Sequence, residues 1–339
     1  MGLRVGFLGT GWIARFHAGM LRSSGEEFDP GPVFDVDPVR SEAFAAEFGY
    51  QVVDSEAAVL DDCDAVYVTT WTSEHGRLVA AAAAAGVHVF CEKPLAVDAR
   101  GARDMASAVE QAGVVAQVGL VLRRSPAFGL AGSLLADERA GRVMAVVFRD
   151  DQFIPVRGHY GSTWRADVAL AGAGTLLEHS IHDLDLLEHL LGPAATVACR
   201  TATFHELPGI DDVAVVTLGF VSGATATLTS VWHDVDERGS LRRVEILCER
   251  AFITVEGDWV GPVRWRYSGD AEESVLEGDA LVADVRRRGV RLGNPDGSFL
   301  RAIRDRRPAW PSLRDAVRAH ELADACYASA ALGGDPVAV

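Results

Sequence analysis

The feature that most constrains the fold is a regular alternation of short apolar runs with amphipathic stretches over the first 120 residues. Parallel sheets are buried on both faces, so their strands are almost continuously apolar and are joined by helices. The pattern predicts strands and intervening helices at these positions: strands at 3–8, 33–36, 65–69, 87–91 and 114–118, and helices at 13–22, 38–48, 73–85 and 98–112. It is typical of a Rossmann doubly wound parallel sheet, the first part of an α/β chain.

The pattern changes after about residue 140, where strand-like runs dominate. Several of them alternate apolar and polar residues, which predicts a large, open, mainly antiparallel sheet in an α+β domain. The predicted elements are strands at 143–148, 196–204, 213–219, 224–232, 243–248 and 252–255, and helices at 175–191 and 313–331. We therefore predict two domains, 1–122 and 123–339, and expect that the last helix can pack back on the first domain.

Composition excludes several classes of partner. The formal net charge of −16 would repel a phosphate backbone and an anionic membrane surface, so we expect neither a nucleic-acid nor a membrane partner. The longest apolar stretch, at 78–89, is too short to span a bilayer. The five cysteines lie far apart with no C-x-x-C pair, which is typical of reduced thiols and predicts a cytoplasmic protein.

A dinucleotide fingerprint follows the first predicted strand and opens the first helix. It reads Gly9-Thr10-Gly11-Trp12-Ile13-Ala14, the G-x-G-x-x-A form. Such glycines allow a tight turn and the close approach of a pyrophosphate to the helix N-terminus. Asp35 ends the second predicted strand, where a carboxylate can hold ribose hydroxyls and repel a 2′-phosphate. The fingerprint predicts NAD binding, with NADP disfavoured; Asp37 is the competing acid.

Lys93 is the only lysine among 32 lysine and arginine residues. A shortage of lysine is explained by biased codon usage, but arginine cannot replace a lysine whose proton is exchanged. Glu92-Lys93-Pro94 directly follows the predicted strand at 87–91. Ligands of open α/β sheets bind beyond the carboxyl ends of the strands, so Lys93 is predicted to lie at the cofactor crevice.

At these motifs the chain resembles the glucose-fructose oxidoreductase and inositol dehydrogenase family, Gfo/Idh/MocA. The resemblance rests on segments 9–14, 86–96 and 172–185 and extends along the whole chain. It implies that Lys93 hydrogen-bonds the reacting hydroxyl, that Glu92 and Pro94 shape the nicotinamide side, and that His182 is the catalytic histidine.

Glu178 and His182 are spaced i and i+4 within the predicted helix at 175–191, so both are expected on one face. That spacing suits an acid/base pair in which the histidine takes the alcohol proton and the carboxylate orients it. Lys93 is a second candidate for the same proton, and both alternatives stay open. The family commonly has Asp where this chain has Glu178. We expect no metal, because no third histidine lies at a diagnostic spacing.

Other site residues are expected in two places. The loop after the strand at 65–69 is predicted to contact the cofactor through Thr70, Trp71 and His75. Arg123, Trp164 and Arg165 are predicted to line the substrate pocket, with ordinary packing between domains as the alternative interpretation.

The sequence predicts an NAD-dependent dehydrogenase acting on a secondary alcohol of a sugar, cyclitol or related polyol. The first alternative is a sugar-modifying enzyme that uses tightly held NAD transiently around an elimination or hydrolysis. The second is a non-catalytic NAD or sugar sensor. An exposed apolar sheet face invites association, so a homodimer or homotetramer through the C-terminal sheet is expected.

Overall fold

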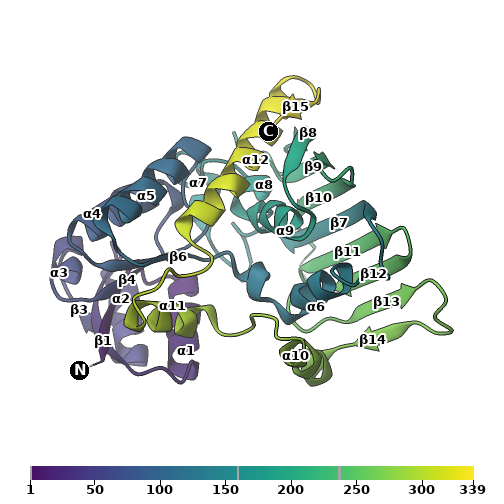
Figure 1. Ribbon diagram of the computed structural model, residues 1–339. Coiled ribbons are helices and arrows are strands. Elements are labelled where there is room, and N and C mark those ends of the chain that lie inside the picture. Colours follow the sequence, from purple (N-terminus) through teal and green to yellow (C-terminus); the bar gives the residue numbers. More distant parts are fainter. Residues whose placement is uncertain (1, 159, 236–237) are drawn as a thin grey trace. The chain divides into compact units, whose positions relative to one another are not determined.

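The computed structural model describes residues 2–158, 160–235 and 238–339 (Figure 1). The chain divides into two compact units, and each is discontinuous in sequence. The first comprises Met1–Leu120 and Gly293–Arg318, and the second comprises Val121–Leu292 and Ala319–Val339. A segment from late in the chain therefore completes the first unit.

The first unit is built on a six-stranded sheet in which every strand pairing is parallel. The strand order is β3 (Gln51–Val52), β2 (Phe28–Phe34), β1 (Leu3–Leu8), β4 (Ala65–Val68), β5 (His88–Cys91) and β6 (Ala116–Val118). The predicted doubly wound sheet is confirmed. The two-residue strand β3 was not predicted, because so short an edge strand has no apolar pattern.

Alternate residues of the strands enter two separate cores. On one face, Phe7, Tyr67 and Phe90 form a stacked row with ring centroids 4.7 Å apart at each step. On the other face, Val66 and Val89 belong to a second buried cluster. Burial on both faces explains why these strands read as continuous apolar runs.

Six helices of the first unit lie within the described residues: α1 (Trp12–Ser23), α2 (Pro38–Phe48), α3 (Glu56–Leu60), α4 (Thr72–Ala84), α5 (Ala99–Ala112) and α11 (Pro295–Arg304). Asp37 and Asp98 accept backbone N–H bonds at the starts of α2 and α5. Helix α11 was not predicted, because it follows a long stretch of chain that belongs to the other unit.

The second unit is built on a nine-stranded sheet in which β7 and β10 pair in parallel and the other pairings are antiparallel. The strand order is β14 (Ser274–Leu276), β13 (Val263–Tyr267), β12 (Ala251–Glu256), β11 (Leu241–Cys248), β7 (Val143–Phe153), β10 (Thr225–His233), β9 (Val213–Phe220), β8 (Ala194–Ala202) and β15 (Val337–Ala338). The predicted large, mainly antiparallel sheet is confirmed.

One face of this sheet is covered by helices α6 (Pro126–Leu135), α8 (Thr175–Glu178) and α9 (Ile181–Leu191) (Figure 1). Alternate strand residues such as Val146, Val216 and Leu228 are buried beneath them. The side chains between them point the other way, and the exposed apolar ones are 37–48% exposed: Val147, Val215, Leu247 and Phe252. In the described part of the unit, this second face is open.

The remaining helical segments are η1 (Val121–Arg124), η2 (Thr163–Ala166), α7 (Val168–Ala171), α10 (Gly278–Arg287) and α12 (Leu313–Ala331). Helix α12 contributes Leu313 and Val317 to a core of the first unit and Leu322 and Cys326 to the core of the second. Among the described residues, no helix is both long enough and apolar enough to cross a membrane.

Candidate active site

The glycine turn joins the end of β1 to the start of α1. Gly9 has a φ of +85°, and a Cβ there would lie 2.8 Å from the carbonyl oxygen of Thr69. Gly11 precedes α1 without a side-chain cap, and no atom lies within 4 Å of a Cβ built on it. Open space at an uncapped helix N-terminus fits the diphosphate of a dinucleotide.

Asp35 lies directly after β2 and is hydrogen-bonded to this turn. Its Oδ2 accepts bonds from the backbone N–H of Thr10 at 2.7 Å and from the Thr10 hydroxyl at 3.1 Å. The competing acid, Asp37, is engaged as the cap of α2, where it accepts the N–H of Val39 at 3.0 Å. Asp35 is therefore the acid bound to the glycine turn, and it stays the predicted ribose contact.

Two predicted contacts flank the turn on α1. Trp12 is 65% exposed and stacks on Phe16 with ring centroids 6.3 Å apart, while Ile13 is half-buried. In the loop after β4, Thr70 and Trp71 are half-buried, and Trp71 precedes the first residue of α4. These four residues stay predicted cofactor contacts.

His75 joins this loop to the segment that carries Lys93. Its side chain is 1% exposed. The Nδ1 atom lies 2.8 Å from the carbonyl oxygen of Pro94, and Nε2 lies 3.3 Å from that of Thr70. This burial favours a role in holding the two loops together over the predicted direct contact with the cofactor.

Lys93 follows β5 and is held through its own backbone. The buried Glu92 carboxylate accepts the Lys93 N–H through Oε2 at 3.0 Å. Its Oε1 lies 2.9 Å from Nε2 of His17, and Nδ1 of His17 lies 2.7 Å from Oδ1 of Asp296. His17 and Asp296 were not predicted. His17 shares the buried face of α1 with Ala14 and Ala18, but no local signal in the sequence pairs it with Asp296 in α11.

The electrostatics of this cluster favour a charged histidine. Burial pushes the pKa of His17 down, but Asp296 and Glu92 outweigh burial and raise that pKa to about 10. Burial raises the pKa of Glu92, and His17 and Lys93 lower it by more, so the net shift is downward. At neutral pH these electrostatics favour an imidazolium bound between the two carboxylates.

The segment that carries Glu178 and His182 corrects the prediction of one helix at 175–191. Helix α8 ends at Glu178, and α9 begins at Ile181. At the break, the N–H of Ser180 donates to the carbonyl of Thr175, five residues back, at 2.9 Å. The i, i+4 spacing therefore does not place Glu178 and His182 on one helix face.

Side chains at the break explain why the helix is interrupted. The Ser180 hydroxyl lies within hydrogen-bond distance of two groups, Oδ2 of Asp150 at 3.2 Å and the hydroxyl of Ser230 at 2.6 Å. His179 Nε2 lies 3.1 Å from Oδ1 of Asp150. These partners on β7 and β10 hold the side chains of the break, and short polar side chains are known to compete with the backbone ladder of a helix.

A buried arginine holds the same region. Arg242 donates to Asp183 at 2.8 Å, to Asp150 at 3.0 Å and to the half-exposed Asp258 at 2.6 Å. Burial raises the pKa of Asp183, Arg242 opposes the shift and Asp150 adds to it, and the result is about 8. One member of this network, Asp183, follows His182 directly in sequence. The network was not predicted, because its members come from α9, β7, β11 and the turn after β12.

Glu178, Trp164 and Arg165 lie close to one another. Arg165 Nε donates to Oε2 of Glu178 at 3.0 Å, and its Cζ lies 4.2 Å from the centroid of the Trp164 ring. The Glu178 side chain is fully buried, whereas that of Arg165 is 23% exposed. His182, in the first turn of α9, is 8% exposed. Glu178 is thus paired with a cation and remains a candidate.

Arg123 lies on η1 and is bound to α9. It donates two bonds to Asp185, from Nε at 2.8 Å and from Nη2 at 2.6 Å. The Arg123 side chain is 11% exposed. This bidentate pair holds η1 against α9. Arg123 stays a predicted substrate contact. Among the residues the structure describes, no group of three or more His, Cys, Asp or Glu side chains is arranged to hold a metal.

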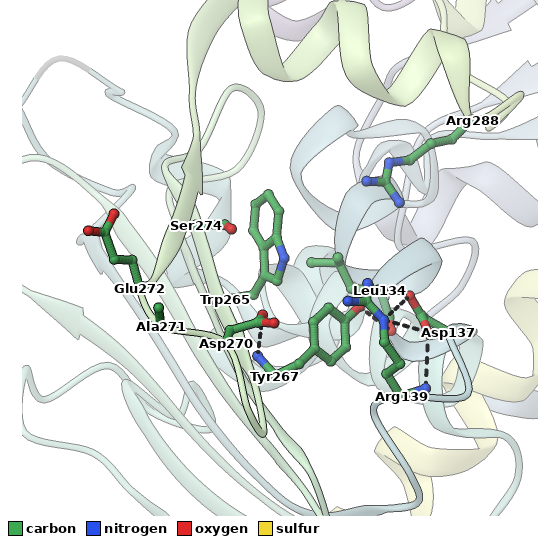
Figure 2. A pocket seen from close by; sticks show the side chains of 10 residues that line it. All are labelled: Leu134, Asp137, Arg139, Trp265, Tyr267, Asp270, Ala271, Glu272, Ser274 and Arg288. Atoms are coloured by element: carbon green, nitrogen blue, oxygen red, sulfur yellow. Dashed lines mark hydrogen bonds and ion pairs between the residues drawn. The ribbon is translucent and has the colours of Figure 1, made fainter.

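A pocket of about 460 Å³ lies elsewhere in the second unit, beside β13 and the turn that follows it (Figure 2). Several of its groups are engaged with one another: Arg139 pairs with Asp137 at 2.9 Å and lies over the ring of Tyr267, and Asp270 accepts the Tyr267 N–H. No predicted site residue is among those that line it. This pocket is not part of the candidate active site.

Comparison with known families matches both parts of the chain. Residues 3–120 match the family described as oxidoreductase family, NAD-binding Rossmann fold (Gfo/Idh/MocA). Residues 128–254 match a Gfo/Idh/MocA C-terminal domain. The two matches follow one another in the order that the family resemblance implied.

Individual relatives extend this result. The chain is 34% identical to a 1,5-anhydro-D-fructose reductase of Ensifer adhaerens over 229 residues, 66% of this chain and 67% of the relative. It is 29% identical to an inositol 2-dehydrogenase of Rhizobium meliloti (strain 1021) over 343 residues, 98% of both chains. The solved structure of a levoglucosan dehydrogenase in complex with NADH superposes with a TM-score of 0.85 at 20% identity, covering 100% of this chain and 99% of that one. The structural likeness shows a shared fold.

Proposed function

Because the chain belongs to the Gfo/Idh/MocA oxidoreductase family, we propose that it transfers a hydride between NAD and a secondary alcohol of a sugar, cyclitol or related polyol. One observation carries the proposal. The glycine turn, Asp35 and Lys93 follow strands β1, β2 and β5 of one parallel sheet, so all three lie at its carboxyl edge.

The residues at that edge suit NAD. The uncapped start of α1 offers its N–H groups to the diphosphate, and Asp35 offers a carboxylate to the ribose hydroxyls. A 2′-phosphate placed near Asp35 would be repelled, so NADP is the poorer cofactor. When bound, NAD would accept the hydride from the carbon that carries the reacting hydroxyl.

The proton of that hydroxyl is assigned to Lys93 and His182. The backbone N–H of the single lysine is bound to Glu92, so the position from which its side chain reaches a substrate is fixed. A histidine titrates near neutral pH and can exchange the same proton. Glu178 is paired with Arg165, which suits a carboxylate that orients other groups.

The second unit supplies the substrate contacts in this proposal. Trp164 and Arg165 present an aromatic face and hydrogen-bond donors, and polyhydroxylated substrates need such donors for discrimination. The relatives named above act on a sugar derivative and on inositol, according to their names. We assign this chain the same class of substrate without naming a member of it.

Self-association through the second unit is also proposed. The open face of the nine-stranded sheet carries Val147, Val215, Leu247 and Phe252, which are apolar and partly exposed. A second copy would cover them, giving a homodimer or a homotetramer.

The test is a screen of sugars and inositols with NAD and NADP, followed by NAD(P)H absorbance. Steady NADH formation with at least one polyol supports the proposal, and activity with NADP alone contradicts the role of Asp35. Conversion of a sugar without a net absorbance change would instead support transient oxidation. A cellular role that survives Lys93→Ala would support a sensor.

A further inference from the structure

The buried cluster of His17, Glu92 and Asp296 includes a residue outside the predicted site, His17. His17 is 0% exposed, and both of its ring nitrogens lie within 2.9 Å of carboxylate oxygens, one of Glu92 and one of Asp296. A buried charge is retained only where its partners compensate the loss of water. An imidazolium between two carboxylates meets that condition.

Each oxygen of the Glu92 carboxylate has a distinct partner. Oε1 is bound by His17, and Oε2 accepts the N–H of Lys93 at 3.0 Å. The orientation of the carboxylate therefore fixes the backbone of the next residue. His75 holds the following carbonyl, that of Pro94, at 2.8 Å. The segment that carries Lys93 is thus fixed on both sides of the lysine.

The space around Glu92 is fitted to this orientation. A Cβ added to Gly119, which directly follows β6, would lie 2.3 Å from Oε1 of Glu92. If the Glu92 carboxylate rotated, Oε1 would lose its contact with Nε2 of His17. If residue 119 had a side chain, the carboxylate could not remain in place. Glycine at position 119 is therefore part of the same arrangement.

We propose that His17 is a positioning residue of the active site: by binding Oε1 of Glu92, it fixes the backbone of Lys93 relative to helix α1. His17 lies on the helix that begins at the glycine turn, six residues after Gly11. One rigid helix thus carries both the proposed diphosphate site and the support of the proposed proton-transfer residue. The expected effect of His17 on turnover rests on the proposed function. The expected effect of His17 on the Lys93 backbone is tested independently of that function.

The single lysine provides a direct probe of the backbone that His17 is inferred to hold. Protein labelled with ¹⁵N only at lysine has one backbone amide resonance, that of the Lys93 N–H bound to Glu92. The amide spectrum of the full-length protein is compared for the wild type, His17→Gln, Gly119→Ala and the matched control His88→Gln. His88 lies at the opposite end of β5, where its Nδ1 accepts the N–H of Val115 at 3.0 Å.

We expect His17→Gln and Gly119→Ala to shift or broaden the Lys93 resonance, and His88→Gln to leave it in place. The same two variants should lower kcat about 100-fold, the order expected for a displacement of about 1 Å. Their Kd for NAD should change less than about threefold, because the glycine turn and Asp35 are unaltered. Gly119→Ala removes no charge, so it tests the inference if His17→Gln does not fold.

Two results would overturn the inference. One is an unchanged Lys93 resonance in both variants, and the other is an unchanged kcat with only a lower melting temperature, which would make the cluster merely structural. Failure of the wild type to oxidise any polyol would contradict the proposed function alone, since the amide resonance would still report on His17.

Discussion

The two units place their candidate residues by different physical means. In the first unit, the glycine turn, Asp35 and Lys93 follow strands, so the order of a parallel sheet brings them to one edge. In the second unit, His182 follows a break between α8 and α9 that is held by side chains from β7, β10 and β11. Sheet topology positions the first set, and a polar network positions the second.

Each unit also contains a buried cation, and the two cations bind different sets of carboxylates. His17 binds two carboxylates within the first unit, and one of them directly supports Lys93. Arg242 binds three carboxylates in the second unit, Asp150, Asp183 and Asp258. Loss of His17 should leave Glu92 and Asp296 without their cation and misplace the backbone of Lys93, whereas loss of Arg242 should leave Asp150 without its cation and Asp183 and Asp258 without their hydrogen-bond donor. Each unit therefore contains a buried cation with several carboxylate partners, and in the first unit one of those partners, Glu92, also binds the backbone of Lys93.

The largest effect is expected from Arg242→Met. Removing one partner of a buried ion pair costs about 3–5 kcal/mol, because here the Asp150 carboxylate stays buried without its cation. Chemical denaturation should show this loss of unfolding free energy, and the control Arg243→Met, at a 45% exposed side chain, should change it by less than about 0.5 kcal/mol. Equal effects of the two substitutions would show that the buried network around Arg242 contributes no more to stability than the exposed ion pairs of Arg243.

The next largest effect is expected from His182→Gln. Loss of a general acid or base lowers kcat by about 100- to 10,000-fold. The Kd for NAD should be unchanged, since His182 belongs to the second unit and the glycine turn to the first. The control is His189→Gln, at an exposed position of the same helix. Steady-state kinetics and NAD titration check both, and full activity of His182→Gln would leave Lys93 as the sole candidate for the proton.

The smallest effect concerns pH and the first unit. The pKa of His17 is raised from 6.5 to about 10, so its stabilising contribution is complete below pH 6.5 and is lost as pH rises toward 10. The groups that face it are Glu92, Asp296 and the ring of Tyr67. Between pH 7 and pH 9 the wild type should lose about 2 kcal/mol more unfolding free energy than His17→Gln.

Denaturation at several pH values measures that difference. A wild type whose stability falls no more steeply with pH than that of His17→Gln would show that the histidine is neutral when folded. The cluster would then resemble an ordinary hydrogen-bonded core histidine, and the first unit would depend on its sheet alone.

The sequence predicts the first unit well because its signals are local. The strands at 3–8 and 65–69 and the helix at 38–48 are each specified by a few neighbouring residues, and Glu92-Lys93-Pro94 is read from its place after a strand. His17 could not be paired with Asp296 in the same way, because 279 residues separate them. Only the return of segment 293–318 to the first unit brings the two together.

In the second unit, prediction from local sequence fails at the segment that carries His182. Periodicity across 175–191 predicts a continuous helix, and the Leu and Glu residues there are good helix formers. The structure breaks it at His179 and Ser180, whose partners Asp150, Ser230 and Arg242 lie on three strands. Tertiary hydrogen bonds outweigh local propensity at this point, and no local pattern contains them.

The central claim is that Lys93 serves proton transfer and not cofactor binding, and Lys93→Arg tests it most directly. Arginine keeps the positive charge but cannot release its proton at working pH. With a polyol found by the screen, we predict that kcat falls at least about 100-fold while the Kd for NAD stays within about threefold. A Lys93→Arg enzyme that turns over at the wild-type rate would contradict the account and make the single lysine a consequence of codon usage.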